Sequence, residues 1–382
     1  MFLDQNGNEL AEVGSVWLDL KNIKKMYQRV DTATNHPWAP DQFESDPNEA
    51  STDAIVFVHG WRMSPDSAGN FAETMYKRLW QRGFTGRFVA FHWDTWWYDA
   101  AGWVPFGAGD AIDAYLAHYN ESEHIAWYAG AGLKDCTDHL SSQKKHIIAH
   151  SMGNIVAGSA LRGGLQVDNY ALLNAAVPAA CYDEDEGRIR QTVQAVRDAG
   201  PFHFTMWDST SPDSDSDLIT RDMAYRGTLK NAAGTLVNFF LPDDYATSFA
   251  WEINNDQTKP PSSDTLLDKN FEYNPAGSPG EKLYKFHDDQ FTGFLVVDYT
   301  ITNKFEAMAF ACRTWGKAVG AWGATEGAIH PGNKVDLSDP LVGGGSKGFD
   351  KEHSGEFDRR IQVLKPFYDV LFDKLRIQRN NP

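Results

Sequence analysis

Between residues 53 and 241 the chain alternates short apolar runs with helix-spaced segments, and this feature restricts its fold more than any other. Apolar runs without the polar alternation of a half-exposed strand indicate strands that are buried on both faces. They occupy residues 54–58, 87–92, 145–149, 170–173 and 236–241, and helical spacing covers 70–81, 110–140 and 155–161. Because strands alternate with helices, the sequence predicts an α/β fold with a mostly parallel central sheet and helices on both faces.

The two ends of the chain carry weaker signals. Residues 14–20 have the alternation of one strand, and the polar sequence that follows them up to Thr52 predicts no other. Residues 256–350 are rich in Gly, Pro, Ser and Asp, with 294–299 as a strand candidate. Residues 357–375 predict a terminal helix, or a pair of helices interrupted at Pro366.

Charge and hydropathy exclude several classes of partner. The chain has 35 basic and 52 acidic side chains and a formal charge of −17, so we expect no nucleic-acid partner. Its apolar runs are far shorter than the roughly 18 residues of a membrane helix, so we expect no integral membrane association. No signal peptide is visible at Met1, which leaves open a cytoplasmic protein or a secreted one whose signal was removed. The sequence shows no motif that indicates an oligomeric state, which stays unknown.

The sequence predicts neither a cofactor nor a metal. Cys136, Cys181 and Cys312 form no C-x-x-C pair, and we expect them to be small buried residues. Acidic runs at 183–186 and 211–217 lack the complete calcium loop of an EF-hand. We expect both runs to be solvated loops, with calcium binding left open.

Ser151 carries the strongest chemical signal. It follows an apolar strand in the order Ala149-His150-Ser151-Met152-Gly153 and precedes a helix. Small residues two positions before and two after the serine allow a sharp, strained turn that lifts the hydroxyl above the end of the strand. The helix N-terminus then offers backbone N–H groups to an oxyanion. The alternative is a serine that only caps a helix.

A second motif, His59-Gly60-Trp61, ends an earlier strand. In this topology its loop approaches the serine turn, so the N–H of Trp61 is the expected second oxyanion donor beside that of Met152. We expect His59 to support the loop by hydrogen bonding rather than to act as a base. A purely structural His-Gly pair at the strand end is the alternative.

These two motifs, followed by an acid and a late histidine, resemble the serine esterases and lipases of the α/β-hydrolase fold. Ala149 departs from the commoner glycine, but some bacterial lipases of this fold have the same Ala-His-Ser-Met-Gly sequence. The resemblance is firm over residues 50–180 and weaker beyond. It implies one α/β-hydrolase catalytic domain over residues 1–382, with inserted loops or cap segments near 182–232 and 256–350.

The resemblance places the acid of a catalytic triad on the loop after a later strand. Asp244, after the run 236–241, fits best, since a small residue follows two positions on. Asp243 is the next candidate, and Asp208 would serve if the acid had moved to another strand end. A turn with two solvated aspartates is the structural alternative.

The family's base comes last in the chain. His353 lies directly before the terminal helix and is therefore the expected base. His287 and His330 are the alternatives.

The predicted activity is hydrolysis of a small-molecule carboxylic ester through an acyl-enzyme on Ser151, with thioesters and amides open to the same residues. A non-catalytic binding protein and an acyltransferase are the alternatives. The residues assigned to the substrate pocket are aromatic and histidine side chains near the strand ends: His59, His150, Trp93, Trp96 and Trp97. Core packing is the other interpretation of the three tryptophans. Acyl and alcohol preferences cannot be read from the sequence.

Overall fold

The computed structural model describes the sheet, the helices around it and the candidate site. The described residues are 27–31, 49–95, 122, 125–177, 179–182, 184, 225, 228–242, 244, 247, 271–274, 283–286, 297–300, 319–322, 329–344, 348–349, 352–358 and 361–379. Several residues named above lie outside these ranges: Trp96, Trp97, Asp208, Asp243, His287 and Cys312, with the strand expected at 14–20 and most of the two acidic runs.

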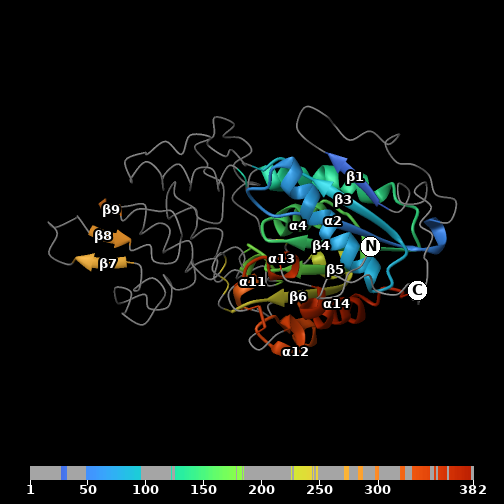
Figure 1. Cartoon of the computed structure of the whole chain (residues 1–382). Helices are drawn as coiled ribbons and strands as arrows, with labels where there is room; N and C mark the ends of the chain where they lie inside the picture. The colour runs from blue at the N-terminus through green and yellow to red at the C-terminus, as the bar shows by residue number, and fades with distance from the viewer. Residues whose placement is uncertain are drawn as a thin grey trace, which may run out of the picture.

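A seven-stranded parallel sheet, covered by helices, is the main element of the described residues (Figure 1). Its order is β1-β3-β2-β4-β5-β6-β10. The strands are β1 (Tyr27–Asp31), β2 (Asp53–Val58), β3 (Arg87–His92), β4 (Lys144–His150), β5 (Val167–Leu173), β6 (Ala233–Phe240) and β10 (Lys334–Asp336). Every pairing is parallel, so the carboxyl ends of all seven strands meet at one edge.

Both faces of the sheet are buried. In β2, Ala54, Val56 and Val58 belong to one hydrophobic cluster, whereas Ile55 and Phe57 belong to another. Side chains alternate across a strand, so the two clusters lie on opposite faces. This two-sided burial is the reason that the central strands have continuous apolar sequences rather than alternating ones.

Helices cover each face. The first cluster is completed by α4 (Gly153–Arg162) and by the helix of residues 125–138. The second is completed by α2 (Pro65–Gln81) and α14 (Ile361–Leu375). α2 begins at Pro65, earlier than the expected residue 70, because the Ser64 side chain accepts the Ser67 N–H as an N-cap and Pro65 suits the first turn.

The remaining elements are short. Helices are α7 (Leu229–Ala232), α11 (Val319–Trp322), α12 (Pro340–Gly343) and α13 (Gly355–Asp358), with 3-10 turns η2 (Glu49–Ser51), η3 (Ala179–Tyr182) and η5 (Pro331–Asn333). An antiparallel sheet joins β7 (Phe271–Asn274), β8 (Leu283–Phe286) and β9 (Val297–Thr300), the last overlapping the candidate at 294–299. Residues 241–333 separate β6 from its sheet neighbour β10. One domain with insertions stays a prediction.

The sequence prediction is confirmed for the five central strands and wrong at the two edges. β1 lies in the polar stretch where no strand was expected, and β10 lies in the segment 256–350 outside its strand candidate. Both are edge strands with one neighbour each, and both carry charged residues such as Arg29 and Lys334. Charged edges discourage pairing with other chains, but they also remove the apolar run that identifies a strand.

The alternative of two helices interrupted at Pro366 is also wrong, because α14 continues through that residue. Leu364, Phe367 and Leu371 of this helix are buried against the sheet. Their packing outweighs the hydrogen bond that proline removes.

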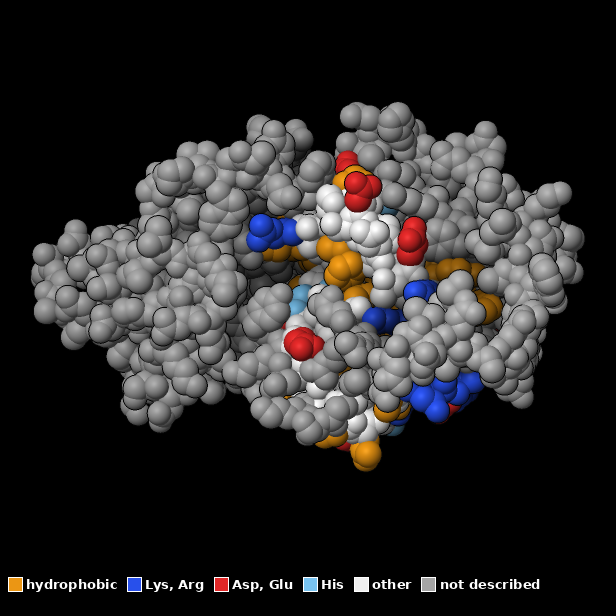
Figure 2. Space-filling model, in the orientation of Figure 1, with side chains coloured by type: hydrophobic (Ala, Val, Ile, Leu, Met, Phe, Trp, Pro, Cys, Tyr) orange, Lys and Arg blue, Asp and Glu red, His pale blue; other side chains and the backbone are white. Residues whose placement is uncertain are grey.

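The order and direction of the strands, with helices on both faces and the serine turn between β4 and α4, make this an α/β-hydrolase fold. The predicted fold class is confirmed. Among the described helices, none combines the length and apolarity needed to cross a bilayer. Acidic and basic side chains are interspersed over the described part of the face seen in Figure 2.

Candidate active site

Ser151 occupies a strained turn at the carboxyl end of β4. Its φ of +53° lies in the left-handed region, which is costly for a residue with a side chain. Neighbouring backbone groups hold this conformation: the Ser151 N–H donates to Leu173 O at 2.9 Å, and the Ser151 carbonyl accepts the Ala176 N–H at 3.2 Å. The strand-turn-helix geometry expected from the sequence is therefore present around this serine.

Asn154 braces the same turn from the first turn of α4. Its Nδ2 donates to the carbonyl oxygens of Ser151 at 2.8 Å and of Ala149 at 3.1 Å. The Tyr170 hydroxyl donates to Asn154 Oδ1 at 2.7 Å, which orients the amide. Both side chains are fully buried, so the turn is held by hydrogen bonds in a dry environment.

The loop after β2 lies directly against the serine. A Cβ on Gly60 would lie 2.9 Å from the Cβ of Ser151, and one on Gly153 would lie 2.4 Å from His59 O. Only glycine permits such close approaches. Trp61 is anchored beside this contact by a 2.8 Å hydrogen bond from its Nε1 to Ser122 Oγ. The loop with Trp61 and the helix start with Met152 therefore meet at the serine.

His59 and Trp93 tie this loop to the end of β3. Trp93 Nε1 donates to His59 O at 2.9 Å, and the Trp93 N–H donates to His59 Nε2 at 3.3 Å. With Nε2 as acceptor, His59 carries its proton on Nδ1, which lies 2.9 Å from Gly60 O. Trp93 is fully buried in the core, as the core-packing interpretation of this aromatic stretch expects.

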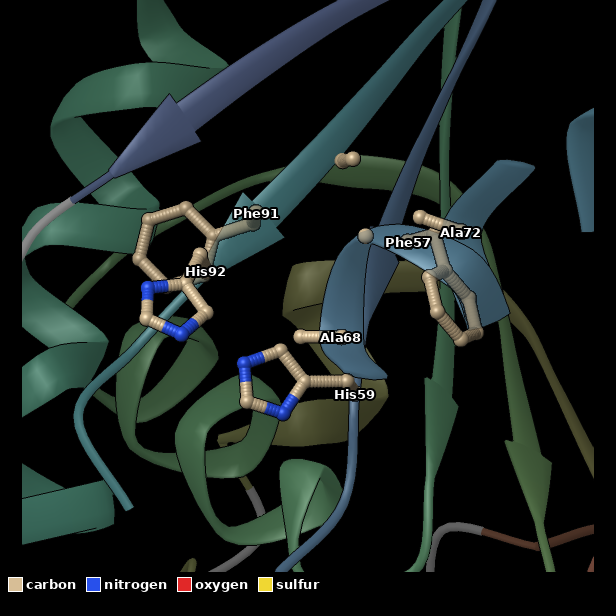
Figure 3. Close-up of a pocket in the computed structure, with 8 residues that line it drawn as sticks. Phe57, His59, Ala68, Ala72, Phe91 and His92 are labelled. Atoms are coloured by element: carbon tan, nitrogen blue, oxygen red, sulfur yellow. The ribbon is translucent and has the colours of Figure 1, made fainter. Parts of the chain in front are cut away.

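A cavity of about 10 Å³ lies behind the loop that follows β2. This volume has room for one water molecule. Figure 3 shows the rings of His59 and His92 on one side of it and Phe57 on the other. The two imidazoles stack with centroids 5.0 Å apart. This cavity is too small for an ester substrate.

Asp244 and His353 come together from different parts of the chain. Asp244 follows β6, and His353 lies between β10 and α13, 109 positions later. His353 Nδ1 lies 2.6 Å from Asp244 Oδ2, and Asp244 Oδ1 accepts the Thr247 N–H at 3.3 Å. Asp244 is fully buried and His353 is buried as well. The pair has the geometry of an acid that orients an imidazole.

The segment that carries His353 is fastened to the rest of the fold by polar side chains. The main-chain carbonyl of His353 accepts hydrogen bonds from Asn174 Nδ2 at 2.7 Å and from His150 Nε2 at 2.9 Å. Farther along, the Arg78 guanidinium of α2 donates to the carbonyls of Glu356 and Phe357. These contacts connect the ends of β4 and β5 and helix α2 to the segment of the predicted base.

His150 is buried and neutral. Burial lowers its pKa to about 3, and repulsion from His353 acts in the same direction. Its Nε2 also lies 3.4 Å from Glu356 Oε1. The side chain points into the interior beneath His353, with Phe357 packed edge-on at 5.3 Å between centroids.

The other candidates have different positions. His330 caps η5, where its Nδ1 accepts the Gly332 N–H at 3.0 Å, and it is exposed. Cys136 and Cys181 are buried, and no disulfide joins these two cysteines, which are the ones within the described ranges. Within the described ranges, no three His, Cys, Asp or Glu side chains gather as metal ligands would.

Sequence reasoning did not identify several side chains that shape the site. They are Asn154, Tyr170, Asn174, Arg78 and Glu356. Asn154 stands next to the serine motif and was within reach of a motif-based search. The other four act through tertiary contacts, so no local sequence signal identifies them.

No protein-family model matches this chain, and no curated protein sequence does. Solved structures resemble about half of it. A lipase-esterase related protein from Clostridium acetobutylicum is 14% identical, with a TM-score of 0.22 over 51% of this chain and 76% of its own. An esterase from Pyrococcus furiosus is 14% identical, with a TM-score of 0.23 over 51% and 64%. A hydrolase from Oleispira antarctica is 14% identical, with a TM-score of 0.24 over 50% and 72%. The fold assignment rests on the order and direction of the strands rather than on these likenesses.

Proposed function

We propose that this protein is a serine hydrolase that cleaves carboxylic esters through Ser151, His353 and Asp244. The buried 2.6 Å contact between His353 Nδ1 and Asp244 Oδ2, at the sheet edge where Ser151 turns, carries the proposal. Since Nδ1–H donates to Asp244, the neutral ring keeps Nε2 as an acceptor. A base for a serine hydroxyl needs this tautomer.

The reaction follows from these roles. Ser151 Oγ attacks the ester carbonyl carbon while His353 Nε2 takes the hydroxyl proton, and Asp244 stabilises the imidazolium that forms. The C–O bond to the alcohol breaks, and His353 returns the proton to the leaving oxygen. Water, activated by His353, then attacks the acyl-enzyme and releases the acid and Ser151.

The backbone N–H groups of Trp61 and Met152 are the proposed donors to the tetrahedral oxyanion. The short Gly60–Ser151 and Gly153–His59 approaches support this, because they bring both backbone segments to the serine. Removing one such donor in other hydrolases costs about 3 kcal/mol of transition-state stabilisation.

The first test is intact mass after exposure to a fluorophosphonate. We expect one adduct on the wild type, none on Ser151→Ala, and one on Ser159→Ala. Ser159 is a matched control because it lies in α4 and its hydroxyl donates to Trp127 O at 2.6 Å. A panel of ester substrates follows, with a competing alcohol to reveal acyl transfer.

A folded wild type that gains no adduct from either a bulky or a small short-chain fluorophosphonate would contradict the proposal. That outcome would favour the non-catalytic binding protein. Turnover with products that contain the competing alcohol would favour the acyltransferase.

A further inference from the structure

Two side chains from adjacent strand ends bind the main-chain carbonyl of His353. His150 Nε2 donates to it from the last position of β4, at 2.9 Å, and Asn174 Nδ2 donates from just beyond β5, at 2.7 Å. All three residues are buried. Buried hydrogen bonds of this kind are strong restraints on position, because breaking one leaves an unsatisfied polar group.

The same two strand ends also hold the serine. His150 directly precedes Ser151, and Asn174 directly follows Leu173, whose carbonyl accepts the Ser151 N–H at 2.9 Å. β4 and β5 are paired in register at this point, with His150 opposite Leu173. At the end of β4, His150 binds the segment of His353 and the next residue is Ser151. At the end of β5, Asn174 binds the segment of His353 and the preceding residue, Leu173, binds the turn of Ser151.

The protonation state of His150 suits this arrangement. A carbonyl can only accept, so the neutral ring must carry its proton on Nε2. Burial, which lowers the pKa of His150, keeps the ring neutral at physiological pH. Its centroid lies 4.8 Å from that of His353. A cation at this distance would oppose formation of the His353 imidazolium, whereas a neutral donor does not.

Glu356 belongs to the same contact. Its Oε1 lies 3.4 Å from His150 Nε2, on the short helix α13 that follows His353. The His150 N–H thus faces two acceptors from the segment of the base, a carbonyl and a carboxylate.

We propose that His150 and Asn174 are positioning residues, which hold the backbone of His353 so that its imidazole reaches Ser151. This inference rests on the proposed function, since it concerns the base of that reaction. Asp244 orients the ring, and His150 and Asn174 locate the backbone from which the ring extends. A displacement of about 1 Å in a reacting group can cost roughly 100-fold in rate.

The test compares three variants with the wild type on a short-chain ester. His150→Leu and Asn174→Gly each remove one donor, and His150→Gln keeps a donor near the position of Nε2. Glycine is chosen at residue 174 because its φ of +42° suits glycine, so the backbone is not strained. We expect His150→Leu and Asn174→Gly to lower kcat by roughly 10–100-fold with KM changed less than about twofold. His150→Gln should recover most of the loss.

His146→Leu is the matched control. His146 lies in the same strand, is fully buried, and contacts Asn169 Nδ2 through Nδ1 at 2.9 Å. It is near the other end of β4, away from Ser151. We expect His146→Leu to lower thermal stability as His150→Leu does, yet to leave kcat at the wild-type value.

The outcomes separate this inference from the proposed function. An active wild type with kcat of His150→Leu and Asn174→Gly within twofold of it would overturn the inference alone, as would an equal loss in His146→Leu. A wild type with neither turnover nor a fluorophosphonate adduct would overturn both. If His150→Leu does not fold, Asn174→Gly and the kcat of His150→Gln decide the question.

Discussion

Gly60 lies so close to Ser151 that a Cβ at residue 60 would be 2.9 Å from the serine Cβ. This approach brings the backbone of the loop after β2 to the turn after β4, although the two residues lie 91 positions apart in the printed sequence. The absence of a side chain at residue 60 is therefore a requirement of the site rather than of the loop itself.

Gly60→Ala should inactivate the protein. The new methyl group would meet Ser151 Cβ at 2.9 Å, His150 Nδ1 at 3.0 Å and His150 O at 3.3 Å, so the loop must move away. We expect kcat/KM on esters to fall by about 100-fold or more, with a lower Tm. Gly163→Ala, after α4, is the control: its nearest contacts are at 3.3 Å, and activity should persist. Wild-type activity in Gly60→Ala would show that the loop does not serve the reaction.

Asp244→Asn should keep the fold and lose the activity. An amide at this position no longer stabilises an imidazolium and favours the wrong tautomer of His353, a change that costs about 10⁴-fold in kcat in a serine protease. We expect a loss of that order in steady-state kinetics. Asp243→Asn makes the same change of charge one residue away and should be close to wild type. Reversed effects would identify Asp243 as the acid.

Asn154→Asp should destabilise the fold as well as the turn. The carboxylate cannot donate to the Ser151 and Ala149 carbonyls and would repel them, so we expect a loss of about 2–3 kcal/mol in the free energy of unfolding. Tyr170→Phe removes the hydroxyl that donates to Asn154 Oδ1 and should cost about 1 kcal/mol. Urea unfolding measures both. A smaller loss of unfolding free energy for Asn154→Asp than for Tyr170→Phe would show that Asn154 does not stabilise the turn.

His150 should make the stability depend on pH. Burial lowers its folded pKa to about 3, whereas an unfolded histidine titrates near 6.5, so between these values the unfolded chain binds the extra proton. This contribution is complete above about pH 6.5 and is lost as the pH falls towards 3. The His150→Gln variant lacks this pH-dependent contribution to stability. The ionisable groups around the site, His353, Asp244 and Glu356, remain in both proteins. The stability of the wild type relative to His150→Gln should therefore decline from pH 7.5 to 4.5 in urea unfolding. A constant difference would show that His150 is not held neutral.

The sequence predicted strands correctly where both faces of the strand are buried. Residues 54–58 and 147–149 are apolar and fully buried within strands that are covered on both faces, so their hydrophobicity identifies them as strand residues. The prediction failed at β1 and β10, because an edge strand is held by backbone hydrogen bonds to one neighbour, and backbone pairing leaves little trace in the side chains.

The site, too, could be predicted only in part: its local motifs are recognisable in the sequence, whereas its long-range contacts are not. Ser151 and the His-Gly-Trp loop are recognisable because their chemistry requires particular residues at fixed local spacing. Asp244 was chosen from three aspartates and His353 from three histidines, and the 2.6 Å contact between them is a tertiary fact. That contact supports this choice; their catalytic roles stay predictions.

The sequence by itself determined where the central strands and helices lie along the chain and the strained turn at Ser151, because periodicity and turn chemistry act between near neighbours in the chain. Only the tertiary structure decided which side chains surround that turn. His150 and Asn174 both donate to the carbonyl of His353, a residue about 180 to 200 positions later in the chain. Such contacts depend on how parallel strands bring their ends together at one edge, and local sequence does not encode the distance between those ends.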